Sequence, residues 1–138
     1  MIGVLTSEEI QDVLTRGRHA HLACSLGDQP YIVPINYAYD GGALYSYSAP
    51  GRKIGVMRAQ PRVCAQIGEI EGPSDWRSVV VEGVFEELTD ERERQAAIHL
   101  MTGNGAVVNR GLGPLSSQVI VYRIRILDIG GRFERRDA

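Results

Sequence analysis

The stretch YSYSAPGRKIGVMRAQPRV, residues 45–63, passes from a strand pattern to a helix pattern through the turn Ser-Ala-Pro-Gly. Residues 53–59 predict a short helix that ends before Pro61. Arg52 and Lys53 stand side by side at its start, and Lys53 is the one lysine among fifteen basic residues. The free N–H groups of a first helical turn attract negative charge. From these residues alone, a solvated turn is the favoured interpretation and an anion site is the alternative.

The side chains at this turn suit a phosphate. Ser48 offers a hydroxyl donor, Arg52 a planar fork of donors and Lys53 a compact charge. The stretch contains neither the GxxxxGK[ST] pattern nor the GxGxxG pattern. Hydrolysis of a nucleoside triphosphate is therefore not predicted.

Upstream of this stretch the sequence predicts one helix and then several strands. Thr6 and Glu9 have the spacing of a capping box, apolar residues follow at helical spacing, and Gly17 ends the helix. From residue 19 the pattern becomes β-rich, in the runs HAHLACSL (19–26), YIVPINYAY (31–39) and ALYSYSA (43–49), which turn signals separate. We expect the last two runs to form a hairpin.

The downstream half predicts two strands, a helix and a final strand. The strands are RVCAQIGEI (62–70) and WRSVVVEGVFEEL (76–88), and the helix is TDERERQAAIHLMT (89–102), with His99 on its surface. In QVIVYRIRILDI (118–129), strand alternation places Ile120, Tyr122, Ile124 and Ile126 on one face and Val121, Arg123 and Arg125 on the other. The glycine-rich segment 103–116, with Asn104, Asn109 and Arg110, could cover a cleft as a lid.

About six short strands with hairpin turns predict a mainly β protein with few helices, a closed or partly closed antiparallel barrel. We expect residues 1–138 to form one domain. A barrel of this size fills its interior with side chains, so ligands would bind outside it, where two subunits meet.

Composition excludes several classes of function. The chain has 138 residues, a net charge of -2 and a pI near 5.9, without the basic stripe of a nucleic-acid-binding protein. It has no apolar run of about 18 residues that could span a membrane, and its acidic start is unlike a signal peptide. We therefore expect a cytoplasmic protein that binds neither nucleic acid nor membrane.

The cysteines and histidines predict no metal site. Cys24 and Cys64 lie apart in apolar runs, which favours buried free thiols over a nucleophile. His19 and His21 point the same way on one strand, but no third ligand follows at a suggestive spacing.

Taken in order, RHAHLACS, QPYIVPINYAYDGGALYSYSAPGRKIGVMRAQPRVC and WRSVVVEGVFEEL resemble the pyridoxamine 5'-phosphate oxidase-like family of FMN-binding split barrels. Within it the chain is most similar to the small Nim-type (nitroimidazole-resistance) proteins. The resemblance covers most of residues 18–88. It implies a six-stranded split barrel and a homodimer with FMN in two clefts at the interface.

The resemblance also implies which residues contact FMN. Arg52, Lys53 and Ser48 would hold its phosphate, and Tyr47 would contact the cofactor from the strand. The strand residues Val33, Pro34, Ile35, Asn36 and Tyr37 would run beneath the ring, and Ser78 and Trp76 would belong to a second contact strand. For Trp76 the alternative is a core or interface anchor.

Two positions depart from the family pattern. Tyr47 stands where many Nim-type members have histidine, and the C-terminus lacks the tryptophan of true pyridoxamine-phosphate oxidases, so vitamin B6 oxidation is not expected. The resemblance predicts an oxidoreductase that passes electrons from NAD(P)H through FMN to a small acceptor, nitroaromatic or quinone-like. The alternatives are a non-catalytic flavin- or haem-binding protein and a deazaflavin-dependent reductase.

Overall fold

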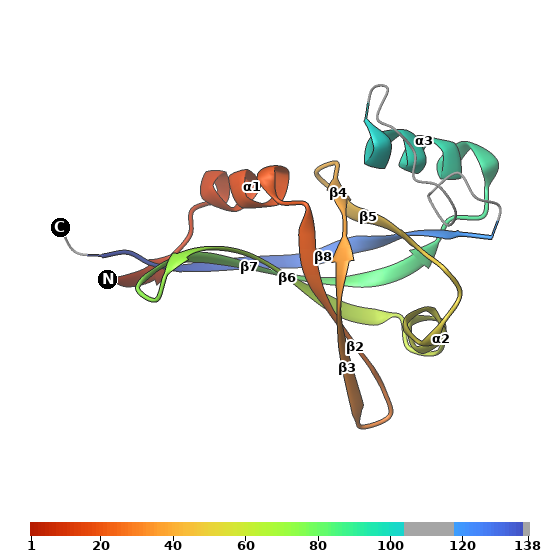
Figure 1. The fold of residues 1–138 in the computed structure, drawn as a ribbon, viewed down its shortest axis with the longest axis horizontal. Coiled ribbons are helices and arrows are strands. Elements are labelled where there is room, and N and C mark those ends of the chain that lie inside the picture. The colour runs from red at the N-terminus through yellow and green to blue at the C-terminus, as the bar shows by residue number, and fades with distance from the viewer. Residues whose placement is uncertain (104–117, 137–138) are drawn as a thin grey trace.

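The computed structural model of the chain describes residues 1–103 and 118–136, which form one antiparallel sheet and three helices (Figure 1). The prediction of a mainly β fold is confirmed, but the described residues hold eight strands where about six were expected. The two extra strands, β1 and β4, have three and two residues, too few to show an alternation in sequence. The strands are β1 (Ile2–Val4), β2 (His19–Leu26), β3 (Gln29–Asn36), β4 (Ala38–Tyr39), β5 (Ala43–Ser48), β6 (Arg62–Gly72), β7 (Asp75–Glu87) and β8 (Ile120–Glu134), and the helices are α1 (Ser7–Arg16), α2 (Arg52–Ala59) and α3 (Glu91–Thr102).

The order of the strands explains how the sheet curls into a split barrel. The order is β3-β2-β6-β7-β8-β5-β4, and β1 pairs with the far end of β8. β3 and β4 therefore lie at opposite edges of the sheet, although only Tyr37 separates them in the chain. The hydroxyl of Ser46 in β5 donates a hydrogen bond to the carbonyl oxygen of Asn36 at the end of β3 (2.6 Å). We call this junction between β3 and β5 the seam.

The strand pairing at the seam shows that one prediction is wrong. The run YIVPINYAY is not a single strand that forms a hairpin with residues 43–49. β3 pairs along its whole length with β2, and only β4 pairs with β5. The chain changes partners at Tyr37, whose backbone N–H donates to the carbonyl oxygen of Arg18 (3.0 Å). Tyr37 is the point at which the barrel closes, and local sequence carries no signal of closure.

Side-chain hydrogen bonds cap the N-termini of two helices, α1 and α3. The Thr6 hydroxyl accepts from the N–H of Glu9 (3.2 Å), and the Glu9 carboxylate accepts from the N–H of Thr6 (2.9 Å), which confirms the predicted capping box. Asp90 caps α3 in the same way, by accepting from the N–H of Glu93 (3.1 Å). α2 begins at Gly51, which has no side chain to cap the first turn.

Two hydrophobic clusters make up the core. The larger fills the barrel with inward residues of the strands and with the apolar faces of α1 and α2; its members with less than 2% exposure include Leu14, Leu22, Leu44, Ile54, Met57, Ile67, Val79, Val81, Tyr122 and Ile124. The smaller lies under α3 and contains Leu88, Ala97, Ile98, Val119 and Val121. Val121 points away from Tyr122, as its alternation predicts, but it is buried because α3 covers that face.

Within residues 1–103 and 118–136, no helix is both long enough and apolar enough to cross a bilayer. Asn104, Asn109 and Arg110, the residues expected in a lid, lie outside the described residues.

Candidate functional site

Two adjoining hollows lie along the seam. The first, of about 280 Å³, is lined by Pro34, Ile35, Asn36, Tyr47 and Lys53. The second, of about 130 Å³, is lined by Asn36, Tyr37, Tyr47 and Met101. Because Asn36 and Tyr47 line both, the two hollows form one depression that runs from Lys53 to Met101, which we call the seam cleft. The seam cleft brings together six of the predicted site residues: Pro34, Ile35, Asn36, Tyr37, Tyr47 and Lys53.

Lys53 is the cation of the seam cleft. Its side chain is half-buried, and burial lowers the pKa of its ammonium group. No acidic side chain in the described part of the chain forms an ion pair with it. The nearby thiol of Cys24 has its pKa raised by burial, against the opposing influence of Arg52 and Lys53, so it stays neutral. Lys53 is thus a partly desolvated positive charge without a counter-ion among these residues.

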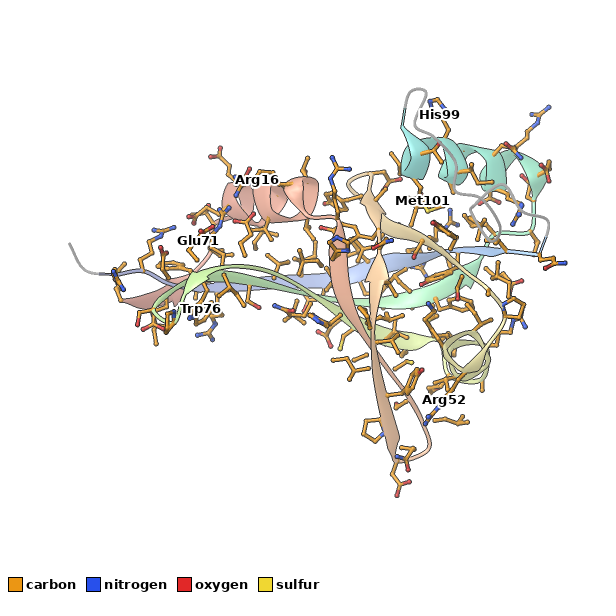
Figure 2. The ribbon with its side chains drawn as sticks, in the orientation of Figure 1. Arg16, Arg52, Glu71, Trp76, His99 and Met101 are labelled. Atoms are coloured by element: carbon orange, nitrogen blue, oxygen red, sulfur yellow. The ribbon has the colours of Figure 1, made fainter. Side chains whose placement is uncertain are left out.

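Arg52 takes a different direction from Lys53. Successive residues of a helix point about 100° apart, so the two side chains diverge from the first turn of α2. The guanidinium carbon of Arg52 lies 4.3 Å above the centre of the Tyr31 ring. Figure 2 shows Arg52 between α2 and the β2–β3 hairpin. Arg52 is exposed, and it too has no ion pair within the described ranges.

The remaining predicted contacts near the turn lie at the border of the cleft. The Ser48 hydroxyl donates to the carbonyl oxygen of Ala49 (2.8 Å), so it must turn before it can donate to a ligand. Val33 is half-buried and packs against the barrel core rather than lining the cleft. The structure therefore places Ser48 and Val33 beside the cleft.

Trp76 and Ser78 lie away from the seam cleft within one chain. They belong to β7, which is three positions from β3 and two positions from β5 in the strand order. The indole N–H of Trp76 donates to Glu134 (3.1 Å), and Ser78 accepts from the side-chain amide of Gln66 (3.0 Å). Figure 2 shows Trp76 at the opposite end of the sheet from Arg52. One chain by itself does not bring these two residues to Lys53.

The face of the sheet that carries Trp76 and Ser78 exposes several large apolar side chains among polar and charged ones such as Gln66 and Arg132. The register places Ile70 opposite Trp76 and Ile32 opposite Ala23, on the face that points away from the core and from α1. We call this the outer face. Its exposed apolar side chains are Ile2, Val4, Ile32, Ile70 and Val80, with relative exposures from 44% to 77%. Such a surface is typical of a binding interface.

A larger hollow of about 360 Å³ lies between α3 and the strands β4, β5 and β8, and the arginine that lines it is paired with acidic side chains. Arg123 pairs with Glu86 (2.8 Å) and with Glu93 (3.3 Å). Asp40 accepts the hydroxyl hydrogen of Tyr45 (2.8 Å). The cation of this hollow, Arg123, is thus paired with acidic side chains, in contrast to Lys53.

The other sequence predictions have simple outcomes. Cys24 is buried as expected, while Cys64 is only partly buried, and both are free. His21 lies 3.4 Å from the side-chain oxygen of Gln66, and the part of the chain that is described holds no group of three or more potential metal ligands. His99 is exposed on α3, as predicted.

Sequence reasoning missed two residues of this region, Tyr31 and Met101. Tyr31 shares a face of β3 with Val33 and Ile35, and this alternation could have placed it beside the predicted ligand path. Met101 lies on the apolar side of α3, and only the fold shows that this side reaches Tyr47.

Comparisons with known proteins give a consistent result. Residues 6–132 match the family model described as pyridoxamine 5'-phosphate oxidase. An uncharacterised protein of Rhizobium meliloti (strain 1021) is 49% identical over 87 residues, 63% of this chain and 58% of that protein, so the match spans less than two thirds of the relative.

Solved structures support the same assignment. A protein from Mesorhizobium loti, described as FAD-binding, has 37% identity and a TM-score of 0.82, over 98% of this chain and 99% of that one. A candidate 5-nitroimidazole antibiotic resistance protein from Bacteroides thetaiotaomicron has 18% identity and a TM-score of 0.78, over 96% and 87% of the two chains. The second likeness concerns the fold alone.

Proposed function

The chain belongs to the pyridoxamine 5'-phosphate oxidase family, and from this premise we propose that it is a flavoprotein whose flavin lies in the seam cleft. The observation that carries the proposal is Lys53, a half-buried cation that lines the cleft without an acidic partner among the described residues. A phosphate would supply the missing negative charge. The Mesorhizobium loti relative, described as FAD-binding, supports the proposal that this phosphate belongs to a flavin.

The phosphate would sit at the Lys53 end of the cleft. Lys53 provides the charge, Arg52 a second cation nearby, and the uncapped first turn of α2 free N–H groups. No acidic residue lies in this first turn to repel the phosphate. Ser48 can rotate its hydroxyl from Ala49 toward the ligand. FMN is the smallest flavin that carries this phosphate.

The ring of the flavin would lie between Lys53 and Met101. The backbone of Pro34, Ile35 and Asn36 offers polar groups along one side, and Tyr47 and Met101 offer contacts to a flat aromatic surface. The Ser46 hydrogen bond to Asn36 holds the two walls at a fixed separation. The residues present therefore fit a flavin.

We expect a homodimer, because one chain gives an incomplete site. The two hollows of the seam cleft, of about 280 and 130 Å³, together lie only at the lower end of the range of about 300–1,000 Å³ that is typical of ligand pockets. The apolar outer face provides a surface that a second copy can cover. Pro34 and Asn36 are exposed at the edge of this face, so a copy packed on it would also close the cleft.

The dimer gives Trp76 and Ser78 a role. Strand alternation places both on the outer face together with Val80. We propose that they contact the flavin held mainly by the other subunit, as the second contact strand of the predicted site. A chain that needs both copies for one site cannot hold its cofactor as a monomer.

The proposed activity is that of an oxidoreductase. A bound flavin would accept two electrons from NADH or NADPH and pass them to a small acceptor such as a nitroaromatic or a quinone. The protein would hold the phosphate at Lys53, orient the ring between β3 and Tyr47, and exclude water through the dimer. No residue of the cleft is assigned a proton-transfer role.

An absorption spectrum of the purified protein tests this proposal. After incubation with FMN and removal of free ligand, the protein should keep flavin bands, and NADH or NADPH should bleach them in the absence of oxygen. A colourless protein, or one with a Soret band of haem, would contradict flavin binding. If flavin bands are present but neither NADH nor NADPH bleaches them, the protein binds flavin without this activity, and the proposed oxidoreductase is contradicted.

A further inference from the structure

We propose that Tyr31 and Arg52 form a stacked platform that binds the AMP half of FAD, so that this chain prefers FAD to FMN. This inference rests on the proposed flavin site and concerns the part of the ligand beyond the phosphate at Lys53. FMN ends at this phosphate, whereas FAD continues with a second phosphate and an adenosine.

The platform lies next to the phosphate end of the seam cleft. Lys53 lines the cleft, and Arg52, its neighbour in the chain, lies outside the cleft and above Tyr31. Tyr31 and Ile35 share one face of β3 and are separated by about 13 Å along the strand. A ligand that leaves the cleft past Lys53 therefore meets Arg52 first, with the Tyr31 ring beneath it.

The guanidinium of Arg52 is positioned above the Tyr31 ring by this contact. Its carbon is 4.3 Å from the ring centre, within the range of a cation–π interaction. Tyr31 is itself half-buried and packs against the barrel core, so its position is fixed. The contact thus favours one position of an exposed arginine, beside the phosphate end of the cleft.

The guanidinium plane of Arg52 has two unused binding features. No carboxylate within the described ranges pairs with its N–H groups, which can therefore donate to a second phosphate. One of its faces lies on Tyr31, while the side chain as a whole is exposed. The opposite face is open to an adenine ring, and guanidinium planes stack on bases. The two features match the two groups that FAD adds to FMN.

Titration of the flavin-free protein with riboflavin, FMN and FAD, followed by flavin fluorescence, tests the inference. The wild type should bind FAD roughly tenfold more tightly than FMN, the scale of one stacking contact. Tyr31→Leu keeps an apolar side chain against the core but removes the ring, and should abolish this preference with FMN affinity unchanged within about twofold. Arg52→Lys keeps the charge but not the plane, and should reduce the preference as well.

Tyr39→Leu is the matched control, because Tyr39 is a half-buried tyrosine that packs on the same core and bonds to Gln11, away from the cleft. It should leave the ratio of FAD to FMN affinity unchanged. Equal affinities of the wild type for FAD and FMN, or an equal loss of both in Tyr31→Leu, would overturn the platform but leave the flavin site intact. If no flavin binds at all, the proposed function fails, and the inference fails with it.

Discussion

Ser46 and Tyr122 lie opposite each other in β5 and β8, yet Ser46 gives its hydroxyl hydrogen to Asn36 instead. The Tyr122 hydroxyl is fully buried and lies near the Ser46 hydroxyl, but it forms no hydrogen bond of regular geometry among the described residues. The bond from Ser46 to Asn36 shapes the seam cleft, because Asn36 lines both of its hollows. Closure of the barrel at the cleft thus leaves a polar group unsatisfied in the core.

Tyr122→Phe should raise the free energy of unfolding by on the order of 1 kcal/mol, because it removes a buried polar group that gains nothing from the fold. Tyr37→Phe is the matched control of opposite sign. The Tyr37 hydroxyl donates to the carbonyl oxygen of Leu14 (2.8 Å), and the loss of this hydrogen bond should lower the free energy of unfolding by about 1 kcal/mol. Urea denaturation of the two variants checks both signs. A destabilised Tyr122→Phe would show that its hydroxyl has a partner in solution.

Stability should fall in alkaline solution. Burial raises the pKa of both Tyr122 and Tyr37 to about 12, above the unfolded value near 10. Between pH 10 and 12 the folded protein keeps protons that the unfolded chain releases, so the free energy of unfolding decreases as pH rises. Tyr122 alone contributes up to about 1.4 kcal/mol per pH unit, and Tyr37 adds to this.

Denaturation at pH 9, 10 and 11 measures this slope. Tyr122→Phe should make it shallower, because one of the two groups is gone. A slope that is the same in wild type and Tyr122→Phe would mean that Tyr122 ionises equally in both states, contrary to its burial.

A charge on the outer face should prevent the proposed dimer. Val80 lies in the middle of this face, with 44% exposure, between Gln66 and Gly130 in the register. Val80→Arg should give a monomer by light scattering and should lose flavin affinity. Leu100→Arg is the control, since Leu100 has a similar exposure of 37% but lies on α3, away from this face. A dimer that survives Val80→Arg would place the interface elsewhere.

The strands with a clear local pattern could be predicted well. The run HAHLACSL coincides with β2, because apolar alternation and the Gly27-Asp28 turn are local properties of the sequence. The run YIVPINYAY was misread as one strand, because its change of partner at Tyr37 depends on the opposite edge of the sheet. The pairing of two distant strands cannot be predicted from the local sequence of either strand alone.

In the candidate site, too, some residues could be placed from the sequence and others only from the fold. The pairing of Lys53 with residues 34–37 and Tyr47 follows from the family resemblance, and the structure brings these residues into one cleft. Trp76 and Ser78 do not reach this cleft within one chain, because β2 and β6 lie between β7 and β3, and β8 lies between β7 and β5. The contact between Arg52 and Tyr31 could not be predicted, because it depends on how α2 packs against the β2–β3 hairpin.

The central claim is that Lys53 holds the phosphate of a flavin. Lys53→Met keeps the apolar stem and removes the charge, and Lys53→Arg is the control that keeps it. Titration with FMN and riboflavin, which differ only in the phosphate, gives the most direct measurement. The account predicts that Lys53→Met weakens FMN binding by roughly 1.5–3 kcal/mol more than riboflavin binding, while Lys53→Arg largely retains FMN. An equal loss for the two ligands in Lys53→Met would contradict it and place the phosphate elsewhere.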